Sequence, residues 1–363
     1  MTDSGRIVDE FIKLASFDSE TGNEDKIGDY LFRLLLENGF EVERDSIGNI
    51  YGLLKGDPDI EPILFSSHMD TVSPGKNKKV IIHDDGKITS DESTVLGADD
   101  ISGLVSIIET IRVIKEDGLT HGDIEVLFSV QEESFCSGTK DFDFSKIKAK
   151  QAYVLDLSGS IGGAALSAPS ILTFTETVYG KSAHSGFDPE SGIHAIHLAA
   201  KAIANIKNGH IDETTTVNIG LINGGIAPNI VPDKVVITGE IRSLSHEKAL
   251  EQAKLIEETF LKAVEGTKAR VTHEVKVNFK AYNTEEYSKT VKRFVRACNR
   301  VGVNADLQTT FGGSDNNRLT EHGIEGIVIA CGMNNVHTTK EYTSVVDLTL
   351  SAEVTLALAT DSE

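Results

Sequence analysis

Acidic and histidine side chains recur where apolar segments of this sequence end or where a helix is expected to begin. They are His68, Asp70, Asp99, Asp100, Glu132, Glu133, Asp156 and His337. Imidazole nitrogens and carboxylate oxygens are common ligands of zinc and related divalent ions. Taken singly, such residues are more often helix caps, solvated strand ends or incidental surface groups. Their joint occurrence predicts a site for two divalent metal ions, with zinc as the best candidate and cobalt or manganese as substitutes.

Two pairs in this set have spacings that suit different tasks. His68 and Asp70 are two residues apart on an expected strand, so their side chains leave the same face and the carboxylate can orient the imidazole. Glu132 and Glu133 are adjacent at an expected strand end, from which both can reach one site. One of them could ligate a metal while the other takes a proton from a water between two metals, and the residues alone do not say which.

The elements that must position these residues follow from the apolar pattern. Short apolar runs at Ile63–Ser67, Ile124–Val130 and Ala152–Leu155 are typical of strands that are buried on both faces. Between the first two runs, apolar residues recur at helical spacing from Leu104 to Ile114. This β-α-β pattern predicts an α/β domain of three layers, with a mostly parallel sheet between helices. In such sheets ligands bind at the carboxyl ends of the strands, where the acidic and histidine residues fall.

A change of pattern after residue 166 predicts an inserted domain. Strands are expected at 172–179, 216–222, 234–242 and 270–279, and helices at 193–206 and 249–264. Their order is β-α-β-β-α-β, which is typical of a ferredoxin-like α+β domain. The sequence therefore predicts a discontinuous catalytic domain at 1–166 and 281–363, with the inserted domain at 167–280. Near the N-terminus, Asn23 or Asp25 is expected to cap the second helix.

Composition narrows the classes of partner. The chain has 35 basic and 56 acidic side chains, a formal net charge of −21, which argues against binding of nucleic acid or of an anionic membrane. No apolar run approaches the ~18 residues of a membrane-spanning helix. Cys136, Cys298 and Cys331 are far apart and are assigned to the core, not to a disulfide framework or a nucleophile. We expect a cytoplasmic protein.

The same residues carry a resemblance to a known enzyme family. The sequence resembles the di-zinc exopeptidases that include peptidase T (tripeptide aminopeptidase), carboxypeptidase G and aminoacylase, and it is most similar to the peptidase T-like branch. The matching segments, in chain order, are Ser67–Val72, Leu96–Asp100, Gln131–Glu133, Val154–Asp156, Ala183–Gly186, Pro228–Pro232, Gly239–Ser243, Gly312–Asp315 and His337–Thr338. They span nearly the whole chain. One departure is Ile101, where the family often has lysine, and it leaves the metal ligands intact.

The resemblance implies a role for each residue of the site. The implied metal ligands are Asp99 as the bridge between both ions, His68 and Asp156 on one ion, and Glu133 and His337 on the other. Glu132 is implied to be the general base, and Asp70 is implied to orient His68. These roles extend the prediction from the residues alone, which left the tasks of the two glutamates open.

The resemblance also assigns the inserted domain. In this family the domain is a lid that commonly dimerises, so a homodimer through residues 167–280 is implied. His184 resembles the residue that reaches a neighbouring active site and holds the substrate carbonyl. Asn229 and Arg242 resemble groups that bind the substrate backbone or its terminal carboxylate, which the planar guanidinium fits. Without the resemblance, Arg242 would be interpreted as half of an ion pair on a sheet surface.

Three functions are weighed. The leading one is a metal-dependent exopeptidase that hydrolyses the N-terminal peptide bond of short peptides, as a tripeptidase does. The alternative is a carboxypeptidase or an N-acyl-amino-acid amidohydrolase of the same family, because the same metals and base serve both reactions. A distant third is a non-catalytic binding protein. Its expected sign would be loss of a ligand or of Glu132, and the sequence keeps them all.

Overall fold

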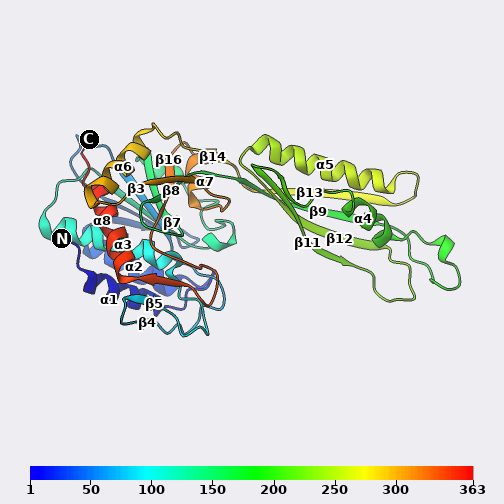
Figure 1. Cartoon of the computed structure of the whole chain (residues 1–363), viewed down its shortest axis with the longest axis horizontal. Coiled ribbons are helices and arrows are strands. Elements are labelled where there is room, and N and C mark those ends of the chain that lie inside the picture. The colour runs from blue at the N-terminus through cyan, green and yellow to red at the C-terminus, as the bar shows by residue number, and fades with distance from the viewer. Residues whose placement is uncertain (363) are drawn as a thin grey trace. The chain divides into compact units, whose positions relative to one another are not determined.

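The computed structural model describes residues 1–362, and the chain folds into two compact units (Figure 1). Unit 1 comprises Met1–Ser167, Asn283–Thr310 and the chain from Ser314 onward. Unit 2 comprises Ala168–Tyr282 together with the short segment Phe311–Gly313. A Cβ atom on Gly313 would lie 2.5 Å from the ring of Phe279, so only glycine allows this close packing of the segment within unit 2.

Unit 1 is built on a nine-stranded sheet in the order β1-β2-β6-β3-β7-β16-β8-β14, with β15 paired to β8. The strands are β1 (Glu41–Arg44), β2 (Ile50–Leu54), β3 (Ile63–His68), β6 (Ile124–Ser129), β7 (Gln151–Leu157), β8 (Gly163–Ala168), β14 (Tyr282–Asn283), β15 (Asp306–Thr309) and β16 (Glu325–Ala330). β3 runs parallel to both β6 and β7, and β7 runs parallel to β16. The pairs β1–β2, β2–β6 and β8–β16 are antiparallel. The predicted mostly parallel sheet is confirmed.

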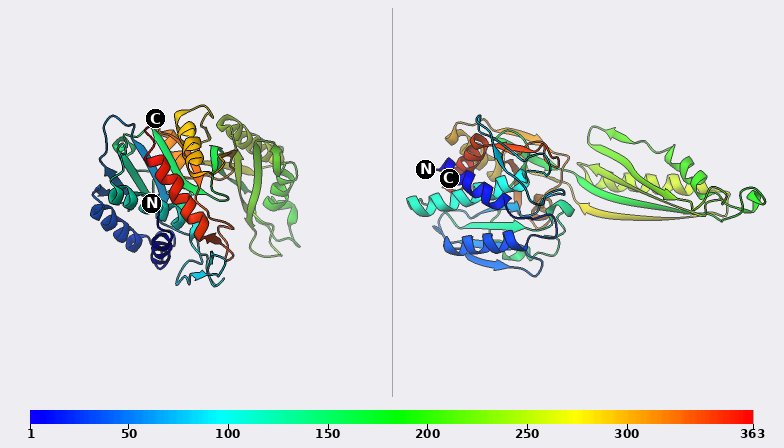
Figure 2. Two further views of the ribbon diagram at one scale, coloured as in Figure 1. Left: turned by 60° about the vertical axis from the view of Figure 1, so that its left-hand side comes forward. Right: turned by 90° about the horizontal axis from the view of Figure 1, so that it is seen from below.

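Both faces of this sheet are covered. The helices of unit 1 are α1 (Ser4–Ala15), α2 (Asp25–Glu37), α3 (Ala98–Asp117), α6 (Lys289–Val301), α7 (Asp315–Glu321) and α8 (Val345–Ala359), and Figure 2 shows them from two further directions. Ile63 and Phe65 of β3 join the larger core, to which α1, α2, α3, α6 and α8 contribute. Leu64, between them, joins a second core that includes Leu319 of α7. Burial on both faces explains the continuous apolar runs that located these strands in the sequence.

Shorter elements complete unit 1. A small sheet has the order β17-β5-β4, with β17 (Tyr342–Ser344), β5 (Lys87–Thr89) and β4 (Ile81–Ile82). Two single turns of 3-10 helix, η1 (Glu132–Ser134) and η2 (Phe144–Lys146), follow β6. α3 begins irregularly, because Gly97 has a left-handed backbone (φ 79°) and Asp99 and Asp100 lie outside the helical range. Among residues 1–362, no helix is both long enough and apolar enough to cross a membrane.

Unit 2 is a five-stranded antiparallel sheet in the order β10-β11-β12-β9-β13. Its strands are β9 (Ser170–Tyr179), β10 (Gly209–Asp212), β11 (Thr215–Gly224), β12 (Lys234–Ser243) and β13 (Arg270–Phe279), and its helices are α4 (Ala195–Ile203), α5 (His246–Val264) and the short η3 (Pro189–Ser191). Apolar residues of α4 and α5 share one core with alternate residues of the strands, such as Leu172 and Phe174. The β-α-β-β-α-β order is therefore ferredoxin-like, with β10 as an addition.

Two local expectations differ from the structure. The residue before α2 is Glu24, neither Asn23 nor Asp25, and its side chain makes no capping hydrogen bond to the helix. β8 was not expected because its sequence, Gly163–Ala168, consists mainly of small residues without the β-branched and aromatic side chains that mark strands. Its position in the sheet depends on pairing with β15 and β16, which are distant in the chain.

Candidate metal centre

Six side chains of unit 1 converge where the central strands end. They are His68, Asp99, Glu132, Glu133, Asp156 and His337. β3 ends at His68, Asp156 lies near the end of the neighbouring β7, and η1 begins three residues after the last residue of β6. Asp99 lies in the irregular start of α3. His337 belongs to the loop between β16 and β17 and has a left-handed backbone, with φ of 62°. The structure thus brings together all the predicted metal ligands and the predicted base at one edge of the sheet.

Asp99 lies between the two histidines. Its Oδ1 atom is 2.9 Å from Nε2 of His68, and its Oδ2 atom is 3.2 Å from Nε2 of His337. Asp156 is on the His68 side, with Oδ1 3.9 Å from Nε2 of His68. Glu133 is on the other side, with Oε2 3.0 Å from Nε2 of His337. Two groups of donors therefore share one carboxylate.

Glu132 is buried beside these groups and is held through its backbone as well as its side chain. Its N–H donates to Oδ1 of Asp70 at 2.9 Å, and its carbonyl accepts from the N–H of Cys136 at 2.7 Å. The thiol of Cys136 lies 3.2 Å from Oε1 of Glu132 and donates to it. Donor atoms of Glu132, His68 and Asp156 lie within 4.8 Å of one another. The carboxylate therefore faces the space between the ligands in a fixed orientation.

Asp70 contacts His68 through its main chain as well as through its carboxylate. Nδ1 of His68 is 2.9 Å from the main-chain oxygen of Asp70, whereas the nearer carboxylate oxygen is 3.5 Å away. The Asp70 carboxylate also accepts hydrogen bonds from the N–H groups of Glu132 and Glu133 and from the hydroxyl of Thr21. β3 ends at His68, so Asp70 is beyond the strand and the two side chains do not simply share a strand face. Asp70 thus connects His68 to the turn that carries both glutamates.

The site gathers more negative charge than its imidazoles can balance. Burial, together with the neighbouring carboxylates, raises the pKa of Glu132 and of Asp156 well above the ordinary range. Burial also opposes ionisation of Asp99, but hydrogen bonds with His337 and His68 outweigh it and lower the pKa of Asp99. Contacts with Asp99 and Glu133 raise the pKa of His337 to about 10. Ionised carboxylates crowded in this way are stabilised by a bound cation.

These residues fit divalent metal ions. Donor atoms of His68, Asp99 and Glu133 lie within 4.8 Å of one another, in a second group that overlaps the first at His68. Oε1 of Glu133 is buried and makes no hydrogen bond to any residue that the structure describes, so it is an acceptor without a donor. A mixed set of imidazoles and carboxylates suits zinc, cobalt and manganese. The chain therefore holds a candidate centre for divalent metal.

Two further residues touch the centre and were not predicted. Glu341, buried to 1% exposure, accepts hydrogen bonds from the N–H groups of Gly97 and Asp99. Cys136 was assigned to the core, and it is buried, but its thiol contacts the predicted base. Cys136 follows Glu132 by four residues across a turn with left-handed residues, and Glu341 follows His337 by four. A spacing of four predicts contact only within a helix, and Glu341 contacts the distant Gly97 and Asp99 and not His337, so the sequence carried no usable signal for either residue.

The predicted substrate-binding residues lie in unit 2, at two different ends of its sheet. The segments of His184 and Asn229 are adjacent, because His184 forms a bridge with Ile230 and the N–H of Ser185 donates to the Asn229 carbonyl. Nδ1 of His184 accepts from two backbone N–H groups, so the neutral ring carries its proton on Nε2 and offers a donor there. Arg242 is near the far end of β12 and donates to Glu240 and to the carbonyl of Phe311. The ion-pair interpretation of Arg242 is therefore observed.

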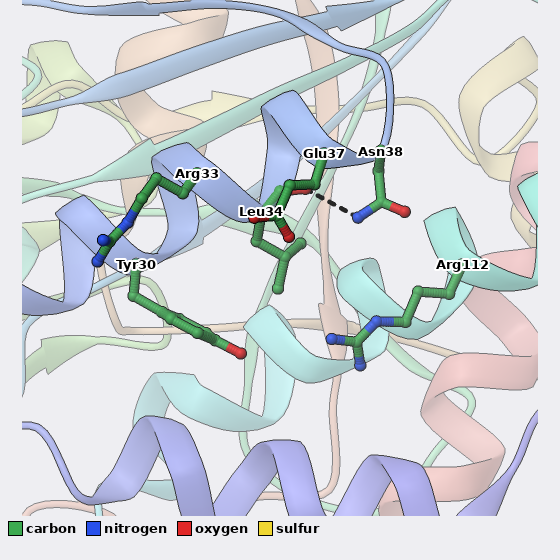
Figure 3. A pocket seen from close by; sticks show the side chains of 6 residues that line it. All are labelled: Tyr30, Arg33, Leu34, Glu37, Asn38 and Arg112. Carbon is green, nitrogen blue, oxygen red and sulfur yellow. Dashed lines mark hydrogen bonds between the residues drawn. The ribbon is translucent and has the colours of Figure 1, made fainter.

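A separate pocket of unit 1 lies elsewhere, between α2 and α3, with a volume of about 450 Å³ (Figure 3). Its lining residues are Tyr30, Arg33, Leu34, Glu37, Asn38 and Arg112. The Tyr30 hydroxyl and the Arg112 guanidinium both bind Glu10, at 2.6 Å and 2.5 Å. Tyr30 and Arg112 are thus paired within the protein, and none of the predicted site residues lines this pocket.

Two family models match the chain. The model described as peptidase dimerisation domain matches residues 167–268, which lie largely in unit 2. The model described as peptidase family M28 matches residues 49–184, which carry His68, Asp99, Glu132 and Asp156. Both matches are to peptidases, and the first agrees in position with the inserted domain.

Relatives of the whole chain agree with these matches. The uncharacterized protein YqjE of Bacillus subtilis is 37% identical over 366 residues, covering 99% of this chain and 98% of its own. The crystal structure of aminopeptidase PepT from Bacillus cereus has a TM-score of 0.93 at 38% identity, and that of a Staphylococcus aureus tripeptidase has 0.95 at 32%. Both comparisons cover 99% of this chain and 98% of the other. The chain therefore belongs to the peptidase T-like family of peptidases that carry this dimerisation domain.

Proposed function

We propose that this protein is a metal-dependent aminopeptidase that hydrolyses the N-terminal peptide bond of short peptides, tripeptides among them. The observation that carries the proposal is the position of Asp99, whose two carboxylate oxygens face His68 and His337 separately. A carboxylate shared in this way is what a pair of metal ions requires as its bridge. The names of the two similar solved structures, a tripeptidase and an aminopeptidase, support the same reaction and substrate class.

The proposed ligands divide as their contacts do. Asp99 would bridge two ions, His68 and Asp156 would complete one, and Glu133 and His337 would complete the other. Glu133 is assigned as a ligand because it contacts His337, whereas Glu132 does not. We propose zinc as the natural metal, with cobalt or manganese as substitutes, since the donors are imidazoles and carboxylates.

Glu132 is proposed as the general base. Bound metals would lower the pKa of a water molecule and polarise the peptide carbonyl. The Glu132 carboxylate takes a proton from the attacking water and then gives it to the nitrogen of the departing amine. Burial favours the protonated form of Glu132 that exists between these two transfers. Asp70 and Cys136 keep the Glu132 backbone and carboxylate in place.

The reaction class can be tested with Ala-Ala-Ala and its N-acetyl form. An aminopeptidase binds the free α-amine, so we expect release of the N-terminal alanine and a loss of at least ~10²-fold on acetylation, because a buried charge would be left unpaired. The released residue is identified by chromatography. Cleavage of the acetylated peptide, or first release of the C-terminal residue, would instead support the carboxypeptidase or amidohydrolase alternative.

We further propose a homodimer through unit 2, in which His184 serves the active site of the partner subunit. β12 has ten residues and spans ~33 Å at ~3.3 Å per residue, whereas an extended tripeptide spans only ~11 Å. A tripeptide therefore cannot reach both His184 and Arg242 of one chain. If both residues bind one substrate, they come from different chains. The match to a peptidase dimerisation domain supports a dimer through unit 2. The cytoplasmic location of the protein stays a prediction.

Mixing two inactive variants tests whether His184 serves the active site of the partner subunit. Chains with His184→Ala and chains with Glu132→Gln should regain part of the activity when their subunits are exchanged, because some hybrid dimers then carry one complete site. The parent homodimers, treated identically, are the control. No recovery after demonstrated exchange would exclude the role in the partner's site and leave the metal centre unaffected.

A further inference from the structure

Glu341 connects two segments that each bring a predicted metal ligand. Its side chain is only 1% exposed, and both carboxylate oxygens accept main-chain hydrogen bonds. Oε2 accepts from the N–H of Gly97 at 2.7 Å, and Oε1 accepts from the N–H of Asp99 at 2.8 Å. Backbone N–H groups that point to one side can bind an anion, and here those of Gly97 and Asp99 bind an internal carboxylate. The backbone of Asp99 is thereby fixed to Glu341.

On its own side, Glu341 is fixed to the loop of His337. The N–H of Glu341 donates to the carbonyl of Thr338 at 3.1 Å. Directly after it, Tyr342 exchanges two main-chain hydrogen bonds with Asn334, at 2.9 and 3.0 Å, and these close the loop at its base. The Glu341 carboxylate therefore connects the loop of His337 to the backbone of the Asp99 segment, in addition to the contact of the His337 ring with the Asp99 carboxylate.

The two metal positions depend on this connection to different extents. His68 and Asp156 are part of β3 and β7, which the sheet holds in place. Asp99 and His337 lie in irregular segments without that support. We infer that Glu341 is a positioning residue that sets the separation of Asp99 and His337, and so controls binding of the metal on the His337 side more than of the metal on the His68 side. The inference rests on the two-metal centre of the proposed function.

Glu341→Gln and Glu341→Ala test the inference, with Glu125→Gln as the matched control. Glu125 is another buried glutamate of unit 1 that accepts main-chain hydrogen bonds, from Lys148 and Ala149, but it starts from the opposite half of β6. Metal-free protein is titrated with zinc by calorimetry, and metal per chain is measured by elemental analysis. Visible spectra of the cobalt-loaded proteins report ligand geometry independently of activity.

We expect one of two binding steps to weaken by ~10–100-fold in Glu341→Gln, the range found when groups that hold metal ligands are removed. The loss should be larger in Glu341→Ala, and Glu125→Gln should bind like the wild type. The Glu133→Gln variant should lose the same step, which assigns it to the His337 side. Unchanged zinc affinities and cobalt spectra in both Glu341 variants, or equal weakening of both steps, would overturn the inference.

The same measurements distinguish a variant that fails to fold, a wrong inference about Glu341 and a wrong proposal of a two-metal centre. If Glu341→Gln does not fold, as seen by circular dichroism, Glu341→Asp keeps the charge and shortens the side chain. It should still bind the His68-side metal like the wild type and the other metal more weakly; two wild-type affinities would overturn the inference. A wild-type protein that binds no metal or one metal per chain would refute the proposed centre itself.

Discussion

Both units bury ionisable side chains, but the ratio of imidazoles to carboxylates differs between them. In unit 2, Glu176 of β9 is fully buried and stands directly opposite His273 of β13, whose Nδ1 contacts its carboxylate. That region has one imidazole for one carboxylate. At the strand ends of unit 1, two imidazoles meet a larger number of carboxylates, namely Asp99, Glu132, Glu133 and Asp156. Burial raises the pKa of Glu176 as it raises that of Asp156.

The difference teaches that burial of a charged group alone does not identify a functional site. Glu125 makes the same point within unit 1, since burial raises its pKa while main-chain N–H groups of Lys148 and Ala149 satisfy it. The candidate centre differs because its carboxylates converge from separate elements and outnumber their partners. Such an excess calls for a cation, whereas the pair in unit 2 calls for none.

Removal of metal should separate the two regions most strongly. Chelation followed by dialysis should lower peptidase activity by more than ~10³-fold, because the water and the carbonyl lose their activating charge. Added zinc, cobalt or manganese should restore it. The structure of unit 2 should not change, which amide hydrogen exchange can follow region by region. Full activity in a protein shown to contain no metal would contradict the conclusion that the carboxylates of unit 1 require a bound cation.

Substitution of the two adjacent glutamates should distinguish chemistry from metal binding. Glu132→Gln should lower kcat by ~10²–10⁴-fold while two metals stay bound, since it removes the general base alone. Glu133→Gln should lose metal, because it removes a ligand. Metal per chain, measured in both variants beside the wild type, decides between the roles. Equal retention in both would show the assignment of base and ligand to be wrong.

Cys136→Ala should have a smaller effect on the same base. Burial raises the pKa of the Cys136 thiol, so it stays protonated and donates to Oε1 of Glu132. Loss of a hydrogen bond to a charged group, about 1.5 kcal/mol, corresponds to a roughly tenfold decrease in kcat with little change in KM. Cys298→Ala, another buried free cysteine that lies in α6, is the control. A change confined to thermal stability would assign Cys136 to packing only.

The smallest effect is expected in unit 2, from Glu176→Gln. Because burial raises the pKa of Glu176, the folded chain keeps its proton to higher pH than the unfolded chain does. The wild type therefore loses stability as pH rises from about 4.3, the pKa of an unperturbed glutamate, through the folded-state pKa. The variant lacks this loss and should be more stable by about 1 kcal/mol at pH 7, with no difference below pH about 4.

Urea unfolding of unit 2, followed by hydrogen exchange at both pH values, measures this difference. Glu274→Gln is the control, since Glu274 is the exposed neighbour of His273 on β13. Lower stability of Glu176→Gln at pH 7 would show that the pair with His273 outweighs the burial of the carboxylate. The contrast between the buried carboxylate of unit 2 and those of the candidate centre would then be smaller than proposed.

The sequence by itself determined the central strands and the candidate residues of the metal centre. Strands buried on both faces must be continuously apolar, so Ile63–Ser67 and Ala152–Leu155 were visible as patterns. Parallel strands bring their carboxyl ends to one edge, and this predicted the meeting of His68 with Asp156. The resemblance added the roles, and the fold class and the family are confirmed.

Only the tertiary structure decided which groups hold these candidate residues in place. The main-chain contact of Asp70 with His68, the thiol beside Glu132 and the carboxylate of Glu341 behind Asp99 all depend on the paths of irregular segments. Those paths use left-handed residues such as Cys136 and His337, which no local periodicity predicts. A periodic pattern specifies which face of an element is buried, whereas a contact between two loops requires that both elements already be placed.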